Sequence, residues 1–370
     1  MSVLTKQISM PRLPSVRGGR AGGKSASRNT AGITGLEIGA TQAIAAQASL
    51  KQGRIVADRV VSRGLPLGLM RDGLVVDPAA LVSELKQLFS DHRLPKRVRV
   101  GLATPRTVLR VLDLPPLEDR DIKAALMMQA QERIPMPLES AVLDYQPVGL
   151  VDTPEGKRMR VVVVATERDG VERLLEVLRR AGLKPEGIDL SIFAVIRALG
   201  IEGAQGPVLY AQLGDLVNIA ISEGGVCRFT RQAPQGLAVV LERLAESLAI
   251  PTQEALALLQ ATSAAHQGDA LTEQDREVRS LLSRTAAELG SELRAAAEFY
   301  ANQFGSGVVT AGVVAGPLAP LPGFVEALAS ASGLELVCGE VSAANDAALG
   351  DVDARLAPVA SGLAVGKVAA

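Results

Sequence analysis

Positions 33–46 read ITGLEIGATQAIAA, and positions 208–220 read VLYAQLGDLVNIA. Gly39 in the first stretch corresponds to Gly214 in the second, an offset of 175 positions. Apolar runs of this length that are bounded by glycine predict short strands joined by tight turns. Glycine at such a turn allows a positive φ and leaves the backbone open to a ligand. The repeat therefore predicts two related half-domains whose paired hairpins could hold a phosphate chain between them.

The composition predicts a soluble globular protein of two or more domains. The chain has 370 residues, too many for one ordinary core, with 48% hydrophobic and 21% charged residues. The net charge is −1, but residues 1–32 carry six basic residues and no acid, so the body is acidic. The acidic body, together with only nine aromatic residues, disfavours a nucleic-acid-binding surface.

The rarer residues and the terminal segments exclude several classes of protein. Two cysteines, Cys227 and Cys338, and two histidines make neither a disulfide framework nor a metal cluster. The N-terminus lacks the apolar stretch of a secretory signal. Residues 1–31 predict a disordered basic tail, in which GGRAGGKS at 18–25 matches the phosphate-loop pattern. No strand precedes this match and no apolar helix follows it, so we interpret it as a coincidence.

Hydrophobic periodicity predicts an alternation of strands and helices. We expect strands at 33–63 (three strands), 98–103, 108–114, 142–148, 159–166, 187–190, 207–232 (three strands), 308–311 and 334–337. We expect helices at 78–91, 119–132, 168–181, 191–199, 236–262, 272–304, 323–332 and 356–368. Prolines 135 and 137 predict an extended segment at 133–138. The uncharged stretch at 302–325 is interrupted by glycines and prolines, which favours a strand, a loop and a helix start over a membrane span. This order indicates an α/β fold with internal duplication.

Several short segments carry a family resemblance. They are GLEIG at 35–39, VVDP at 75–78, LP at 114–115, QERIPMPLE at 131–139, LDYQ at 143–146, AGLKP at 181–185, EFY at 298–300 and LPG at 321–323. With these segments the chain resembles PilM-type proteins of type IV pilus assembly, in the actin-like superfamily that includes FtsA. The resemblance spans roughly residues 33–365, and the IPMP and DYQ segments followed by AGLKP are its most specific part.

The resemblance implies a two-lobe α/β fold of the actin-like, duplicated ribonuclease-H-like kind, with an FtsA-type insertion called 1C. It implies subdomain 1A at 32–103 and 181–206, with a helix at 352–369 returning to it. Subdomain 1C is expected at 104–180 and the second lobe, 2A with 2B, at 207–351. The implied function is that of a cytoplasmic adaptor at the inner face of the membrane. Its implied partners are the N-terminal cytoplasmic peptide of PilN, an inner-membrane protein, and other pilus inner-membrane assembly proteins, so that membrane contact is indirect.

The resemblance also implies an ATP cleft with Mg²⁺, in which each hairpin carries an acid. Glu37 takes the first acidic position, while the second is the neutral Gln212, and Asp215 lies past the turn and is not expected to replace it. The nucleotide-binding candidates are Glu37, Gly39, Ala40, Thr41, Gln212, Gly214, Glu292, Gly312 and Gly316, with Glu37 as the candidate Mg²⁺ ligand. Val313 and Val314 add branched side chains where a base or ribose would approach. We assign no catalytic residue and expect a structural nucleotide, with weak or absent hydrolysis.

Four residues are candidates for the wall of a peptide groove that borders 1C: Gln131, Glu132, Ile134 and Tyr145. A tyrosine offers a hydrogen-bonding tip at a half-wet rim, and an extended peptide would add apolar anchors and backbone hydrogen bonds. The alternative interpretation is packing within the subdomain, which is favoured for Ile134. Glu292 likewise has two interpretations, a ribose acceptor or a solvated helix face.

Other functions stay open at this stage. One is an active ATPase or small-molecule kinase, although no general-base aspartate can be placed from the sequence. Another is an actin-like polymer former, but the C-terminal stretch lacks the polar face of a membrane-attaching amphipathic helix. A third is a component related to GspL of type II secretion, a family that continues into a transmembrane span. Self-association is also left open.

Overall fold

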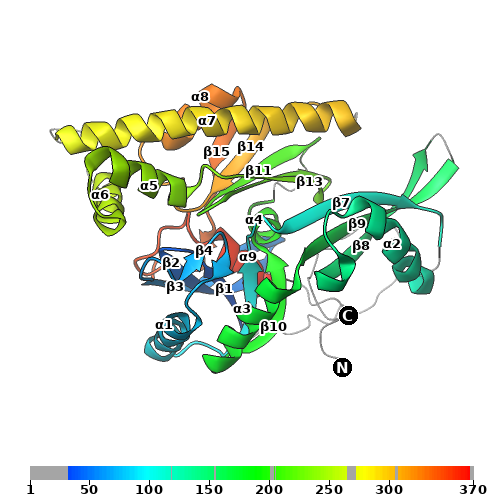
Figure 1. Cartoon of the computed structure of the whole chain (residues 1–370), viewed down its shortest axis with the longest axis horizontal. Helices are drawn as coiled ribbons and strands as arrows, with labels where there is room; N and C mark the ends of the chain where they lie inside the picture. Colours follow the sequence, from blue (N-terminus) through cyan, green and yellow to red (C-terminus); the bar gives the residue numbers. More distant parts are fainter. Residues whose placement is uncertain are drawn as a thin grey trace.

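The computed structural model describes residues 32–117, 119–153, 156–200, 204, 206–264, 272–304 and 307–366. The basic tail at 1–31, with its GGRAGGKS segment, lies outside the described residues. The described chain forms two stacked α/β lobes and a smaller subdomain at one side (Figure 1).

The first lobe is built on a sheet of six strands in the order β10-β6-β1-β2-β3-β16. Its strands are β1 (Ile33–Ile38), β2 (Gln42–Lys51), β3 (Arg54–Gly64), β6 (Arg97–Leu102), β10 (Lys184–Leu190) and β16 (Ser342–Ala343). The lobe also contains a small hairpin, β4 (Met70–Arg71) with β5 (Leu74–Val75), and the helices α1 (Pro78–Asp91), α3 (Arg168–Arg180), α4 (Ser191–Leu199) and α9 (Pro358–Val365). Helix α1 begins where expected, because the Asp77 carboxylate accepts hydrogen bonds from the N–H groups of Ala79 and Ala80, both at 3.0 Å.

The second lobe repeats the central part of this arrangement in a sheet of order β13-β12-β11-β14-β15. Its strands are β11 (Val208–Leu213), β12 (Val217–Glu223), β13 (Val226–Ala233), β14 (Ala311–Ala315) and β15 (Glu335–Cys338). Its helices are α5 (Leu237–Leu248), α6 (Thr252–Ala264), α7 (Glu273–Phe304) and α8 (Phe324–Ser332), and the long α7 runs along the lobe (Figure 1). In both sheets the first strand of the repeat pairs antiparallel with the next strand and parallel with a later one. The predicted duplication is therefore present in the strand pairing itself.

Helix α9 returns the end of the chain to the first lobe, where it packs against β1, β2, β6 and α4. Glycine permits this packing, because a Cβ added to Gly35 would lie 1.9 Å from the Ala360 carbonyl oxygen. Two arginines cap the helix: Arg99 donates to the Leu363 carbonyl, and Arg197 donates to the Gly362 carbonyl at 2.7 Å. The predicted C-terminal helix is thus a buried core element over 358–365.

A separate three-stranded sheet of order β7-β9-β8 forms the side subdomain. Its elements are β7 (Thr107–Leu114), α2 (Asp119–Arg133), a 3₁₀ turn (Leu138–Ser140), β8 (Ala141–Thr153) and β9 (Gly156–Glu167). One face of the sheet packs against α2 through Leu112, Val161, Val163 and Ala165. Residues of the other face, such as Leu109, Val162 and Val164, join the main core of the first lobe.

The structure differs from the sequence-based expectations in four places. Helix α3, which lies in the range expected for subdomain 1C, packs on the first lobe against α1, β5 and β10. Residues 133–138 do not form one extended segment. Pro137 is extended, but the Ile134 N–H still bonds the Ala130 carbonyl and a 3₁₀ turn begins at Leu138, because Ile134 packs into the core under α2. The strand expected at 308–311 instead spans 311–315, where it pairs with β11, and Val308 is 73% exposed. The chain also rejoins the first sheet before residue 351, because Ser342 and Ala343 pair with β3.

The uncharged stretch at 302–325 is not one helix. It contains the end of α7, strand β14, a turn and the first residues of α8. Within the described parts of the chain, no helix combines the length and apolar character that a bilayer span requires.

Candidate functional site

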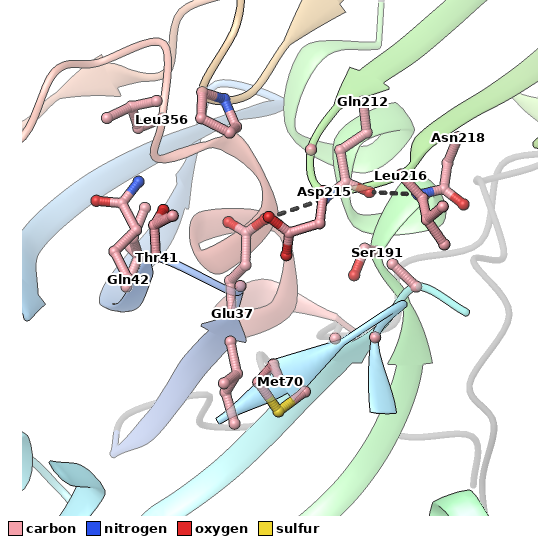
Figure 2. Close-up of a pocket in the computed structure, with 18 of the residues that line it drawn as sticks. Glu37, Thr41, Gln42, Met70, Ser191, Gln212, Asp215, Leu216, Asn218 and Leu356 are labelled. Carbon is pink, nitrogen blue, oxygen red and sulfur yellow. Dashed lines mark hydrogen bonds between the residues drawn. The ribbon is translucent and has the colours of Figure 1, made fainter. Parts of the chain in front are cut away.

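A small cavity of about 50 Å³ lies between the two lobes, where the β1–β2 and β11–β12 turns face each other (Figure 2). The repeat glycines shape these turns. The Gly39 N–H bonds the Gln42 carbonyl at 2.9 Å, and the Gly214 carbonyl accepts from the Leu237 N–H at 2.8 Å. Thr41 lines the same cavity. The structure therefore brings the two predicted hairpins together at one cavity, which we call the cleft.

Glu37 and Gln212 join the two lobes across this cleft. Gln212 Nε2 donates to Glu37 Oε1 at 2.9 Å, and the two residues occupy equivalent positions of the repeat, 175 apart. Burial is the largest effect on Glu37 and raises the pKa of its carboxyl to about 8, while the Gln212 hydrogen bond opposes this shift and nearby Asp215 adds to it. In this arrangement Glu37 is mostly neutral at pH 7.

Asp215, which was not among the predicted site residues, is a second bridge between the lobes. Its Oδ2 accepts a hydrogen bond from the Ala40 N–H at 2.6 Å, again across 175 positions. Figure 2 shows Asp215 and Glu37 pointing toward each other inside the cavity. Burial is also the main cause of the raised pKa of Asp215. The repeat offset could have found this pair, because Asp215 is the counterpart of Ala40.

Four of the predicted nucleotide-binding residues are not among those that line this cavity: Ala40, whose N–H bonds the cavity-lining Asp215, and Glu292, Gly312 and Gly316. Glu292 lies on α7, with its carboxylate 2.7 Å from Arg231 Nη2. Gly312 lies within β14, where an added Cβ would be 3.0 Å from the Leu209 carbonyl oxygen, so close strand packing accounts for this glycine. Gly316 (φ 112°) precedes the cavity-lining Pro317, and its N–H donates to the Arg355 carbonyl at 3.2 Å.

The branched residues expected to obstruct the nucleoside are not at the cavity. Val313 and Val314 are buried, because their strand β14 lies between β11 and β15 inside the sheet. Pro317 and Leu356 line the cavity instead. The turn after β14 and the segment that leads into α9 therefore border the cavity on this side.

A second cavity, of about 130 Å³, lies between β7 of the side subdomain and β13 of the second lobe. Both strands are sheet edges, and they run close to each other (Figure 1). Thr107–Arg110 of β7 and Thr230–Gln232 of β13 line the cavity, together with Leu102, Thr104, Leu190, Ile192, Asn218 and Ile219. We call this cavity the edge-strand groove.

A chain of amide side chains connects the cleft with the edge-strand groove. Asn218 lines both cavities and donates to Gln212 Oε1 at 3.3 Å. Gln232 Nε2 donates to Asn218 Oδ1 at 3.0 Å and to the Thr104 carbonyl at 2.7 Å. Glu37 is thus linked through three amides to the start of the side subdomain.

The four predicted peptide-groove residues lie apart from this groove's lining. Ile134 is 5% exposed and belongs to the core under α2, and Tyr145 packs against the same core. Gln131 and Glu132 are exposed at the end of α2. The packing interpretation therefore holds for Ile134.

The described residues contain no group of three or more His, Cys, Asp or Glu side chains placed to hold a metal ion. Mg²⁺ in nucleotide sites commonly binds one or two charged carboxylates together with the phosphates. Glu37, neutral at pH 7 and bonded to Gln212, does not offer that charge in this arrangement. The donor set alone therefore does not make a magnesium site.

Comparison with known families identifies the chain's relatives. The model of the family "Type IV pilus assembly protein PilM" matches residues 35–364. The chain belongs to the PilM family. A solved structure described as a PilM–PilN type IV pilus biogenesis complex is similar to this PilM family protein, with a TM-score of 0.73 and 24% identity over 91% of this chain and 98% of that chain.

Two further solved structures share the fold. The ethanolamine utilization protein EutJ of Carboxydothermus hydrogenoformans has a TM-score of 0.55 and 18% identity, covering 90% of this chain and 89% of its own. MreB 5 of Spiroplasma citri, solved with AMPPNP, has a TM-score of 0.50 and 12% identity, covering 89% and 94%. These likenesses confirm the predicted actin-like fold.

Proposed function

We propose that this PilM family protein is an adaptor that binds the N-terminal cytoplasmic peptide of a PilN-like inner-membrane protein. The solved relative described as a PilM–PilN complex supports a partner of this kind. Bound in this way, the adaptor would sit in the cytoplasm at the inner face of the membrane. It would meet the other inner-membrane assembly proteins of the pilus through its partner, so that its membrane contact is indirect.

We place the peptide in the edge-strand groove. Strands β7 and β13 are both sheet edges, and an edge strand offers backbone N–H and C=O groups with which an extended peptide can pair. Apolar side chains of Val108, Leu109 and Ile192 line the groove beside these edges and can receive apolar side chains of the peptide. Two facing strand edges around one groove are the observation that carries this proposal.

The nucleotide cleft has a structural role in this proposal. ATP is its candidate ligand, and Mg²⁺ would enter with the phosphates, with Glu37 as the nearest predicted carboxylate. Hydrolysis is weak or absent, because Gln212 carries no charge at the second acidic position and hydrogen-bonds the acid at the first, Glu37. The adaptor function therefore requires no chemical step.

Titration of a synthetic PilN-type N-terminal peptide into the full chain tests the proposal and its location. Thr230→Arg fills the groove and should weaken binding at least about tenfold, whereas the matched control Thr230→Ser should stay within about twofold. Gln131→Ala with Glu132→Ala tests the alternative wall at the end of α2. A loss with this double variant alone would move the site to α2, and no binding by the wild-type chain would overturn the adaptor function.

A further inference from the structure

The hydrogen bond between Asp215 and Ala40 uses an N–H that the sequence analysis assigned to nucleotide binding. Ala40 follows the glycine of the first hairpin, and N–H groups at such turns are donors to phosphate. The Asp215 carboxylate takes this donor at 2.6 Å, and its Oδ2 lies 3.5 Å from where a Cβ of Gly39 would be. A carboxylate oxygen of the protein thus sits directly over the phosphate-binding turn.

The rest of the cavity also disfavours a phosphate chain in this arrangement. Among the described residues that line it, none is lysine or arginine, while Glu37 and Asp215 are both present. Its volume of about 50 Å³ is far below the roughly 300–1,000 Å³ of typical ligand pockets. Pro317 and Leu356 add apolar side chains to its lining.

We propose that the Asp215 carboxylate takes the place of a phosphate oxygen at the Ala40 N–H, a position that we call the phosphate seat. In this position Asp215 holds the two lobes together without nucleotide. The Asp215–Ala40 and Gln212–Glu37 bonds each join equivalent positions of the repeat, one in each lobe. They make the contact between lobes that a bound nucleotide would otherwise make. This inference rests on the cleft of the proposed function, and it adds that a nucleoside triphosphate must displace Asp215 in order to bind.

The proposal predicts how the Ala40 donor and the cleft respond when Asp215 is removed. One N–H cannot serve Asp215 and a phosphate oxygen together, so the apparent affinity for phosphate is the intrinsic affinity multiplied by the fraction of molecules in which this N–H is free of Asp215. Asp215→Ala frees the seat and removes one negative charge from the cavity. Asp215→Asn keeps the side-chain volume and a neutral acceptor, so we expect a smaller effect.

Binding of ATP with Mg²⁺ by the full chain tests this inference. Asp215→Ala should lower the apparent Kd for ATP at least about tenfold and Asp215→Asn by less, while the exposed control Asp346→Ala should match the wild-type chain. Hydrogen exchange at the Ala40 amide should speed up in Asp215→Ala and slow again when ATP is added. If Asp215→Ala folds poorly, a lower apparent Kd for ATP in Asp215→Asn than in the wild-type chain still decides the test.

Equal, weaker or undetectable ATP binding by both Asp215 variants relative to the wild-type chain would overturn the inference. Peptide titration of the same samples keeps this result separate from the proposed function. Wild-type binding of the PilN-type peptide with no gain in ATP affinity would reject the Asp215 seat alone. Absence of peptide binding with a clear gain in ATP affinity would reject the adaptor and keep the seat.

Discussion

Gln212 Nε2 and Glu37 Oε1 lie 2.9 Å apart across the cleft, although 175 positions separate them in the chain. The same offset relates the two copies of the strand–glycine–strand repeat. The bond therefore joins a residue to its own counterpart in the other lobe. The resemblance predicts an acid at each of these two positions, and here the amide of Gln212 hydrogen-bonds the buried carboxyl of Glu37.

The raised pKa of Glu37 predicts a pH-dependent stability. The folded chain binds a proton at Glu37 up to about pH 8, while the unfolded carboxyl loses it near its ordinary pKa of 4.5. The folded state thus holds more protons in this window, and its stability should fall with rising pH by at most about 1.4 kcal/mol per unit. Urea unfolding of wild type and Glu37→Gln at pH 5, 6.5 and 8 checks this. The free energy of unfolding of Glu37→Gln should rise relative to that of the wild type as the pH increases. A difference between the two that stays constant with pH would contradict the prediction.

The contact between Gly35 and α9 predicts a severe effect of one methyl group. In Gly35→Ala the new Cβ would meet backbone atoms of Ala360 and Ala364, at 1.9 and 2.6 Å, and neither can move without displacing the helix. We expect a loss of at least about 3 kcal/mol in the free energy of unfolding. Gly64→Ala is the matched control, because nothing lies within 4 Å of its added Cβ. Similar unfolding midpoints for the two variants would show that α9 does not dock on β1.

Asp189 balances the two arginines that cap α9. Its side chain is fully buried and pairs with Arg197, and Arg99 is 1% exposed beside them. Burial, with the charge of Arg197, lowers the pKa of Arg99 to about 10. Asp189→Asn leaves the buried Arg99 and the partly buried Arg197 without a neighbouring carboxylate and should cost about 3 kcal/mol or more. Denaturant unfolding measures the loss, with the exposed Asp152→Asn as control, and equal stability of the two variants would refute this role.

The amide chain between the cleft and the edge-strand groove predicts energetic coupling. Gln212 and Gln232 both bond Asn218, so removing either one alters the partner of the other. A double-mutant cycle of Gln212→Ala and Gln232→Ala should give an interaction free energy of at least about 0.5 kcal/mol. The same cycle of Gln212→Ala with Gln87→Ala, whose side chain bonds Arg63 on the far side of the first lobe, should be additive. Additivity in both cycles would mean that the amide side chains do not couple the cleft to the edge-strand groove.

Local sequence signals account for most of the fold. Asp77 and the apolar spacing of α1 are short-range features, and the repeat at Gly39 and Gly214 indicates the duplication because each copy must make the same turn. The errors come from segments whose conformation is set by distant partners. Ile134 keeps its segment compact by packing under α2, and the start of β14 is set by pairing with β11.

The candidate site was predictable only in part, for the same reason. Glu37, Gly39 and Gln212 follow from the motif, but the reach of Asp215 across the cleft depends on how the lobes close. The edge-strand groove has no local signal, because it arises where two separate sheets place their edge strands together. Such features require the tertiary structure.

The adaptor account is tested most directly by titrating a PilN-type N-terminal peptide into the wild-type chain, without nucleotide and with ATP and Mg²⁺, while recording phosphate release in the same samples. The account predicts saturable one-to-one binding in nucleotide-free buffer and phosphate release no faster with peptide than without it. Peptide binding that appears only with ATP, or rapid ATP hydrolysis by a chain that does not bind the peptide, would contradict it.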